Sequence, residues 1–253
     1  MKKFRLLSLL IIPAALLASC DAGFSIGGNK EKGANIRGEV QVEEWNAVFD
    51  PVNFVMHTNF VHEVTQTLTD GRKRAFELFE TNYGKLHVKQ EYYLMDAADT
   101  NESGEVKHTK EGYWEFKEVK DRTASGTLYA RTDNQEQFAK SDFADLDLDF
   151  YMFANFGLFP LDFEKCTYDS ETKTYTSESI RFDWTEYDAH LGYTDIKNCK
   201  VKFKNSRPVS YDFDFESIYS SGTLSLAAHD YGVFSNYGKA DFTIPEGVVT
   251  PSE

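Results

Sequence analysis

Hydrophobic and polar residues alternate with a period of two over much of the chain. Alternation of this kind turns one face of each strand toward a core and the other toward water, which is typical of antiparallel sheets. The segments that show it span residues 54–68, 86–94, 114–117, 128–131, 180–185 and 199–216. The pattern predicts a mainly β (α+β) fold built on a curved antiparallel sheet, or half-barrel.

The clearest hairpin lies between residues 199 and 216, with a turn at 205–208. Cys199, Val201 and Phe203 alternate with lysines on its first strand. The second strand alternates apolar and polar residues in the same way. The side chains expected to point inward are Val201, Phe203, Val209, Tyr211 and Phe213.

Two segments favour helices instead. Residues 39–49 place Val42, Trp45 and Val48 on one helical face, and Asp50-Pro51 is expected to end this N-terminal helix. A second, short helical insertion is predicted over residues 141–157, where Ser141 or Asp142 can cap the first turn and Gly157 can end the last. A strand fits the second segment as well, because its leucines also alternate with aspartates.

The N-terminus has a basic start, an apolar run over residues 6–17 and the sequence Leu17-Ala18-Ser19-Cys20. It resembles the signal peptide of bacterial lipoproteins, in which the cysteine after the cleavage site receives lipid. The resemblance implies a signal peptide at 1–19 and a lipid on Cys20. The alternative is an ordinary secretory signal peptide that happens to precede a cysteine.

The rest of the chain then divides into two parts. Residues 20–38 are rich in glycine and lack an apolar period, so we expect a flexible tether. Residues 39–253 form a single β-rich domain in this interpretation. No further run approaches the roughly 20 apolar residues of a membrane-spanning helix. We therefore expect an extracytoplasmic protein anchored to the bacterial cell membrane by its lipid.

The net charge of the chain limits the classes of partner that it can bind. The net charge is −14, and the predicted signal peptide carries only positive charges, so its removal makes the remainder more acidic. An acidic surface repels nucleic acid and anionic head groups. The membrane is therefore expected to be a partner through Cys20 rather than through surface charge. Protein partners cannot be named from the sequence.

Two cysteines remain, Cys166 and Cys199. Export would permit a disulfide between them. Two separate buried thiols are the favoured alternative, because free cysteine packs as a small hydrophobic residue and Cys199 lies on the core face of its predicted strand.

Motifs for catalysis or metal binding are incomplete. His62 begins a zinc-protease-like motif, but Gln66 stands where the second histidine is needed. The series Asp145, Asp147, Asp149 is similar to a calcium loop, but phenylalanine occupies both the glycine and the final glutamate position. Catalytic signatures for nucleotide or acyl chemistry do not occur in the sequence. We expect no metal, no cofactor and no enzymatic activity, with a hydrolase as a remote third possibility.

An N-terminal helix, long amphipathic strands and a helical insertion resemble the LolA/LppX-like lipoprotein fold. The local similarity lies in residues 201–209, 234–238 and 242–245, although Ser206 stands where the family's hairpin usually has glycine. The resemblance implies an open half-barrel that wraps over helices and encloses an apolar cavity. Some members of the family carry acyl chains or lipoproteins.

The chain is rich in aromatic residues, with 21 Phe and 14 Tyr. Inward-facing rings either fill a core or line a cavity. The candidates for a cavity lining are Phe54, Met56, Phe60, Trp114, Phe116, Phe182 and Trp184. The leading hypothesis is a protein that binds a lipid or another hydrophobic ligand there. The alternative is a cell-surface interaction or adhesion module without a small-molecule ligand, which uses its acidic, tyrosine-rich outer face.

Overall fold

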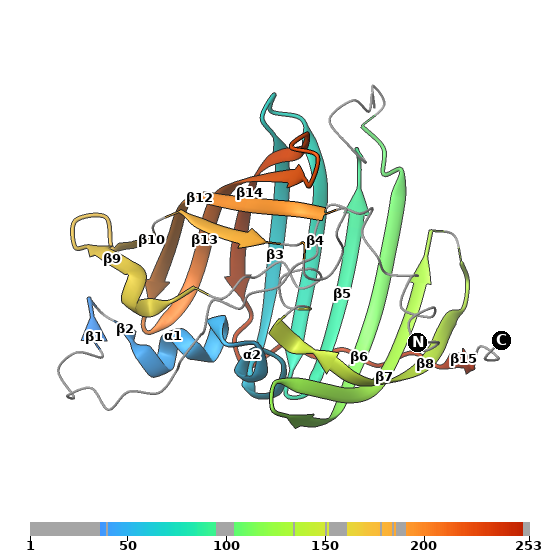
Figure 1. Ribbon diagram of the computed structural model, residues 1–253. Coiled ribbons are helices and arrows are strands. Elements are labelled where there is room, and N and C mark those ends of the chain that lie inside the picture. The colour runs from blue at the N-terminus through green and yellow to red at the C-terminus, as the bar shows by residue number, and fades with distance from the viewer. Residues whose placement is uncertain are drawn as a thin grey trace.

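A strongly curved, open β-sheet dominates the computed structural model (Figure 1). The structure describes residues 36–38, 40–94, 104–133, 135–149, 151, 161–177, 179–183, 185 and 191–249. The predicted signal peptide, Cys20 and Trp184 lie outside these residues. The mainly β fold with a curved antiparallel sheet, predicted from the sequence, is confirmed.

The chain begins with a small two-stranded sheet and two helices. These elements are β1 (Ile36–Arg37), β2 (Val40–Gln41), α1 (Val42–Phe49) and α2 (Pro51–His57). β1 therefore places two residues of the range expected to form the tether in a strand. The first strands of the large sheet are β3 (Asn59–Leu68), β4 (Lys73–Asn82), β5 (Lys85–Tyr92), β6 (His108–Lys120), β7 (Thr123–Thr132) and β8 (Phe138–Asp147).

The second half of the chain adds a 3-10 turn and the remaining strands. These are η2 (Phe163–Lys165), β9 (Cys166–Asp169), β10 (Thr174–Ser177), β11 (Ile180–Asp183), β12 (Leu191–Lys204), β13 (Arg207–Tyr219), β14 (Leu224–Ser235) and β15 (Gly247–Val249).

The large sheet has the order β15-β8-β7-β6-β5-β4-β3-β14-β13-β12-β10-β9, and β11 pairs with the remaining length of β12. Described pairs are antiparallel except β15 with β8, which is parallel. In the middle of the sheet, β3 from the start of the domain pairs with β14 from near its end. No pairing joins β9 to β15 among the described strands, so the sheet stays open.

The helices pack on the concave face of the sheet, which we define as the face that carries Phe60, Trp114 and Phe213. α2 contacts β4, β5 and β6, and Phe54 of α2 lies 5.7 Å from Phe60, centroid to centroid. Trp45 of α1 stacks on Phe203 of β12 at 5.4 Å. These contacts join both helices to one hydrophobic core.

The expected end of the N-terminal helix at Asp50-Pro51 is only the boundary between two helices. The Asp50 carboxylate accepts a hydrogen bond from the Asn53 amide at 3.0 Å and caps α2. Proline is well tolerated at the first position of a helix, because its missing N–H would have no partner there. Phe54 and Met56 therefore lie on α2, and their assignment to the first strand is wrong.

The helix predicted from residue 141 is wrong over the described residues 141–147, which belong to β8. Among the described residues of this segment, helical backbone is found only at 148, 149 and 151. The three-residue spacing of Phe143 and Leu146 suggested a helix, but a β-bulge produces it. Gly126 pairs with Phe143, Ala124 pairs with Leu146, and Asp145 has a φ of 56°. The extra residue lets both apolar side chains face the core.

The predicted hairpin is confirmed as β12–β13. Asn205 and Ser206 have φ of 51° and 61°, as a two-residue type I′ turn requires. Most residues expected to point inward are buried, namely Val201, Phe203, Tyr211 and Phe213. Val209 differs, because a register shift next to Phe203 brings Pro208 opposite that residue instead. Val209 is half-buried and Pro208 is buried.

Candidate functional site

The residues predicted to line a cavity lie in or against the core. Phe54, Phe60, Trp114, Phe116 and Phe182 are all buried members of one hydrophobic cluster. Met56 is half-buried and packs against that cluster. The structure therefore brings these six side chains to the same side of the sheet. Their role in ligand binding stays a prediction.

A line of polar side chains crosses the concave face, which the alternation had predicted to be apolar. It comprises Asp230 on β14, Gln66 on β3, Glu77 on β4, Gln90 on β5 and Lys110 on β6. Gln66 pairs with Asp230 across β3 and β14, Glu77 pairs with Gln90, and Gln90 pairs with Lys110. We call these five residues the polar row.

Arg74 joins the polar row through a β-bulge. Gln66 pairs with Ala75 and Thr67 pairs with Lys73, so Arg74 is the extra residue on β4. Its carbonyl accepts hydrogen bonds from the amides of Tyr93 and Leu94, at 2.8 and 3.2 Å. Its buried guanidinium donates to the side-chain oxygen of Gln66. The bulge thus turns a cation inward next to Ala75, which also faces the core.

Burial shifts the pKa values of the three ionisable residues of the polar row. The pKa of Glu77 rises to about 7, chiefly because burial disfavours its charged form. The pKa of Asp230 rises to about 8, first through burial and then through the nearby charge of Glu77. Burial also lowers the pKa of Lys110 to about 8. Near neutral pH the two carboxyl groups are therefore partly protonated and can both donate and accept hydrogen bonds.

Several polar atoms near the row have no hydrogen-bond partner among the described residues. They are Asp230 Oδ1, the Tyr92 hydroxyl and both ring nitrogens of His62. Tyr92 and Asp230 are only 1% and 8% exposed. Glu77, by contrast, is half-buried, while its polar neighbours are buried. Glu77 is therefore the least buried member of the polar row.

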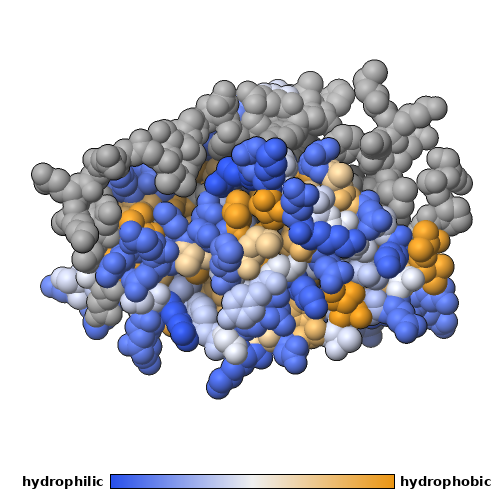
Figure 2. Space-filling view, turned by 90° about the horizontal axis from the view of Figure 1, so that it is seen from below, coloured by the Kyte–Doolittle hydropathy of each residue, from blue (hydrophilic) through white to orange (hydrophobic). Residues whose placement is uncertain are grey.

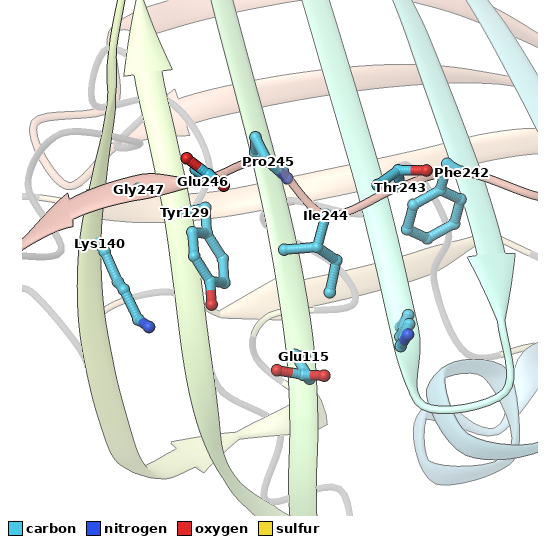
Figure 3. A pocket seen from close by; sticks show the side chains of 10 residues that line it. Glu115, Tyr129, Lys140, Phe242, Thr243, Ile244, Pro245, Glu246 and Gly247 are labelled. Atoms are coloured by element: carbon cyan, nitrogen blue, oxygen red, sulfur yellow. The ribbon is translucent and has the colours of Figure 1, made fainter.

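The opposite, convex face carries a pocket of about 740 Å³. Its floor consists of one side chain from each of four neighbouring strands, Lys85, Glu115, Tyr129 and Lys140. Its other wall is residues 242–247 of the C-terminal strap, by which we mean residues 236–249. Figure 3 shows the strap running across the strands that carry Tyr129 and Lys140. The pocket mixes aromatic, cationic and anionic groups.

A charged network anchors the strap beside this pocket. His87 Nδ1 lies 2.6 Å from Glu80 Oε2, and His87 Nε2 lies 3.1 Å from Glu111 Oε1. The His87 ring stacks on Tyr113 at 4.2 Å, and Phe242 of the strap lies 5.8 Å from His87. The hydrogen bond from His87 is the main reason that the pKa of Glu111 falls to about 2. Sequence analysis missed this site, because its parts are far apart in the chain.

Cys166 and Cys199 are free, buried thiols rather than a disulfide. Cys166 lies on β9, where it pairs with Ser177 of β10, and β10 lies between β9 and β12, the strand of Cys199. An intervening strand holds the two sulfurs apart. Burial raises the pKa of the Cys199 thiol, so this side chain is a core residue rather than a nucleophile.

Seen from below, the surface is largely hydrophilic, and hydrophobic residues gather in small separate groups (Figure 2). Among the described residues, no three or more His, Cys, Asp or Glu side chains come together as a metal site. No helix in the described part of the chain combines the length and apolar character needed to cross a membrane.

No protein-family model matches the chain, and no curated protein matches it.

Proposed function

We propose that the chain is a lipid-anchored, extracytoplasmic binding protein, without enzymatic activity, that holds a hydrophobic ligand on the concave side of its sheet. The sequence Leu17-Ala18-Ser19-Cys20 supports the anchor. The acidic net charge of −14 supports attachment through lipid rather than through surface charge.

The observation that carries the ligand proposal is the size of the concave face. α1 and α2 have 8 and 7 residues, so each is only about 10–12 Å long at about 1.5 Å per residue. A strand such as β3, with 10 residues, is about 33 Å long. Among the described residues, two helices of this size cover only part of a 13-stranded sheet. Glu77, the least buried member of the polar row, lies on the same face.

Quenching by a dibrominated stearic acid tests this proposal on the solubilised full-length chain. Trp45 and Trp114 both face the concave side and are buried. Bromine quenches indole fluorescence only near contact, so a ligand on this side should quench these residues. Trp114→Phe should remove the part of the quenching that comes from this indole. A chain that binds neither this fatty acid nor its ethyl ester would contradict the proposal.

The pocket under the strap favours a second candidate, a surface interaction module. Its volume of about 740 Å³ is within the usual range for ligand sites. Tyr129 and Lys140 offer stacking and charge on an open face. If this candidate holds, the brominated acid will leave tryptophan fluorescence unchanged, and Tyr129→Ala will weaken capture of a partner without loss of thermal stability.

A further inference from the structure

The polar row interrupts a face that otherwise packs as a hydrophobic core. Buried polar groups are normally paired, because an unpaired donor or acceptor loses its bonds to water without replacement. Gln66, Gln90 and Lys110 are all buried around Glu77. A set of groups whose burial is this costly is more typical of a binding site than of simple packing.

The two glutamine side chains form hydrogen bonds to other residues of this group. The Gln90 amide donates to Glu77 Oε1 at 3.2 Å. Gln66 bonds to Asp230 and accepts from Arg74. Asp230 Oδ1 and the Tyr92 hydroxyl keep hydrogen-bonding capacity that no described residue fills. Glu77 lies within electrostatic reach of both Tyr92 and Asp230, and it is the least buried member of the polar row.

The charges around Glu77 are mixed. Arg74 and Lys110 are the nearby cations that stabilise its charged form, and Asp230 is a second acid. A carboxylate or phosphate head group would be repelled by Glu77 and Asp230 to the extent that these two groups are charged. An ammonium head group would be repelled by Arg74 and Lys110. A hydroxyl group carries no charge and both donates and accepts a hydrogen bond.

We propose that Glu77, Asp230 and Tyr92 bind the neutral, hydroxyl-bearing head group of the hydrophobic ligand, such as the hydroxyls of a glycerol or sugar ester. This inference rests on the proposed function, since it assumes that the apolar part of the ligand lies on the concave face. The raised pKa values of Glu77 and Asp230 agree with it, because partly protonated carboxyl groups can both donate a hydrogen bond to a hydroxyl and accept one from it.

The test compares three ligands with the same apolar chain on the solubilised full-length protein. The probes are monoolein, with a glycerol head group, oleate, with a carboxylate, and ethyl oleate, with no hydroxyl. Each competes with the dibrominated stearic acid, and tryptophan fluorescence reports the displacement. Monoolein should bind about tenfold more tightly than ethyl oleate, which corresponds to one or two well-placed hydrogen bonds.

Two variants separate recognition from a structural role. Tyr92→Phe should weaken monoolein several-fold and leave ethyl oleate unchanged. Tyr113→Phe is its matched control, because it removes a hydroxyl from the convex face, and it should change neither. Glu77→Gln removes one negative charge beside Arg74 and Lys110, so it should tighten oleate. A purely structural network gives no reason for that gain.

The outcomes keep the two proposals apart. If all three probes bind equally and Tyr92→Phe and Glu77→Gln leave the ranking unchanged, the head-group inference is overturned while the hydrophobic-ligand proposal stands. If none of the probes displaces the brominated acid or binds by itself, both are overturned. Thermal unfolding of each variant shows that the comparison is made on folded protein.

Discussion

At the scale of single residues, His87 has the clearest dependence on pH. Burial by itself lowers its pKa, but the hydrogen bonds with Glu111 and Glu80 outweigh burial and raise it above the usual value. The folded protein therefore holds this proton more tightly than the unfolded chain does. The resulting stabilisation is complete below the unfolded pKa of about 6.5 and is lost as the pH rises through the folded pKa.

A prediction follows from the raised pKa of His87 in the folded protein. His87→Gln should flatten the pH dependence of stability, and the difference between wild type and variant should be largest at acidic pH and smallest at alkaline pH. Urea unfolding midpoints across this range measure it. A difference that grows as the pH rises would show that the imidazolium is not the stabilising form. Groups that do not contact His87 titrate alike in both proteins and cancel in this difference, whereas Glu80 and Glu111 lose their partner in the variant, so the comparison is made above the pH at which carboxyl groups titrate.

At the scale of elements, Asp50 connects α1 with α2 and both with the sheet. Its carboxylate caps α2 through the Asn53 amide and accepts from Arg122 at 2.8 Å. Arg122 also bonds to Asp149. Asp50→Ala should cost about 1–2 kcal/mol, the usual value for a lost cap. Asp149→Ala is the control, because it removes only an ion pair with Arg122 and should cost less than about 1 kcal/mol.

Chemical denaturation of the two variants measures these costs. Equal losses would mean that the ion pair with Arg122, and not the cap, explains the effect of Asp50.

The β12–β13 hairpin supports a second element-scale prediction. Phe203 is buried against Trp45, so Phe203→Ala should lower the free energy of unfolding by about 3–5 kcal/mol. Lys202 is its exposed neighbour on the same strand, and Lys202→Ala should change stability by less than about 0.5 kcal/mol. Urea unfolding of both variants checks the register, and similar losses would contradict it.

Sequence patterns predicted the elements whose environment is local and missed those that depend on neighbours. The hairpin was predictable, because its turn and alternation lie within 18 consecutive residues, Cys199 to Glu216. The helix at Phe54 was not, because apolar spacing over seven residues fits both periods. At Asp145, a bulge supplied by pairing with β7 gave a strand the spacing of a helix.

The candidate sites show the same limit. Glu77 and Lys110 look like ordinary polar positions in a strand, and only the register of the sheet aligns them with Asp230. The pocket under the strap requires Phe242 to lie over strands more than a hundred residues earlier in the chain. Neither arrangement leaves a local signature in the sequence.

At the scale of the whole molecule, the proposed lipid on Cys20 would decide where the domain resides. Cys20→Ala should leave an unprocessed precursor that incorporates no labelled palmitate in a bacterial host. Cys199→Ala is the control, because this thiol is buried in the folded domain and its loss should leave labelling intact. Equal labelling of both variants would show that lipid is attached elsewhere.

The pairing of β3 with β14 has a consequence for the order of folding. Val61 pairs with Ser235 and Leu68 pairs with Ala228, so the middle of the sheet joins residues from opposite ends of the domain. Until β14 is available, β3–β8 and β12–β13 can only form as two separate meanders. Contacts of such long sequence separation slow folding, because the loop must close before they contribute any stability. A ribosome or translocon that has released the chain only up to β13 therefore holds two incomplete sheets, each with an unpaired edge, and the domain becomes cooperative in one late step.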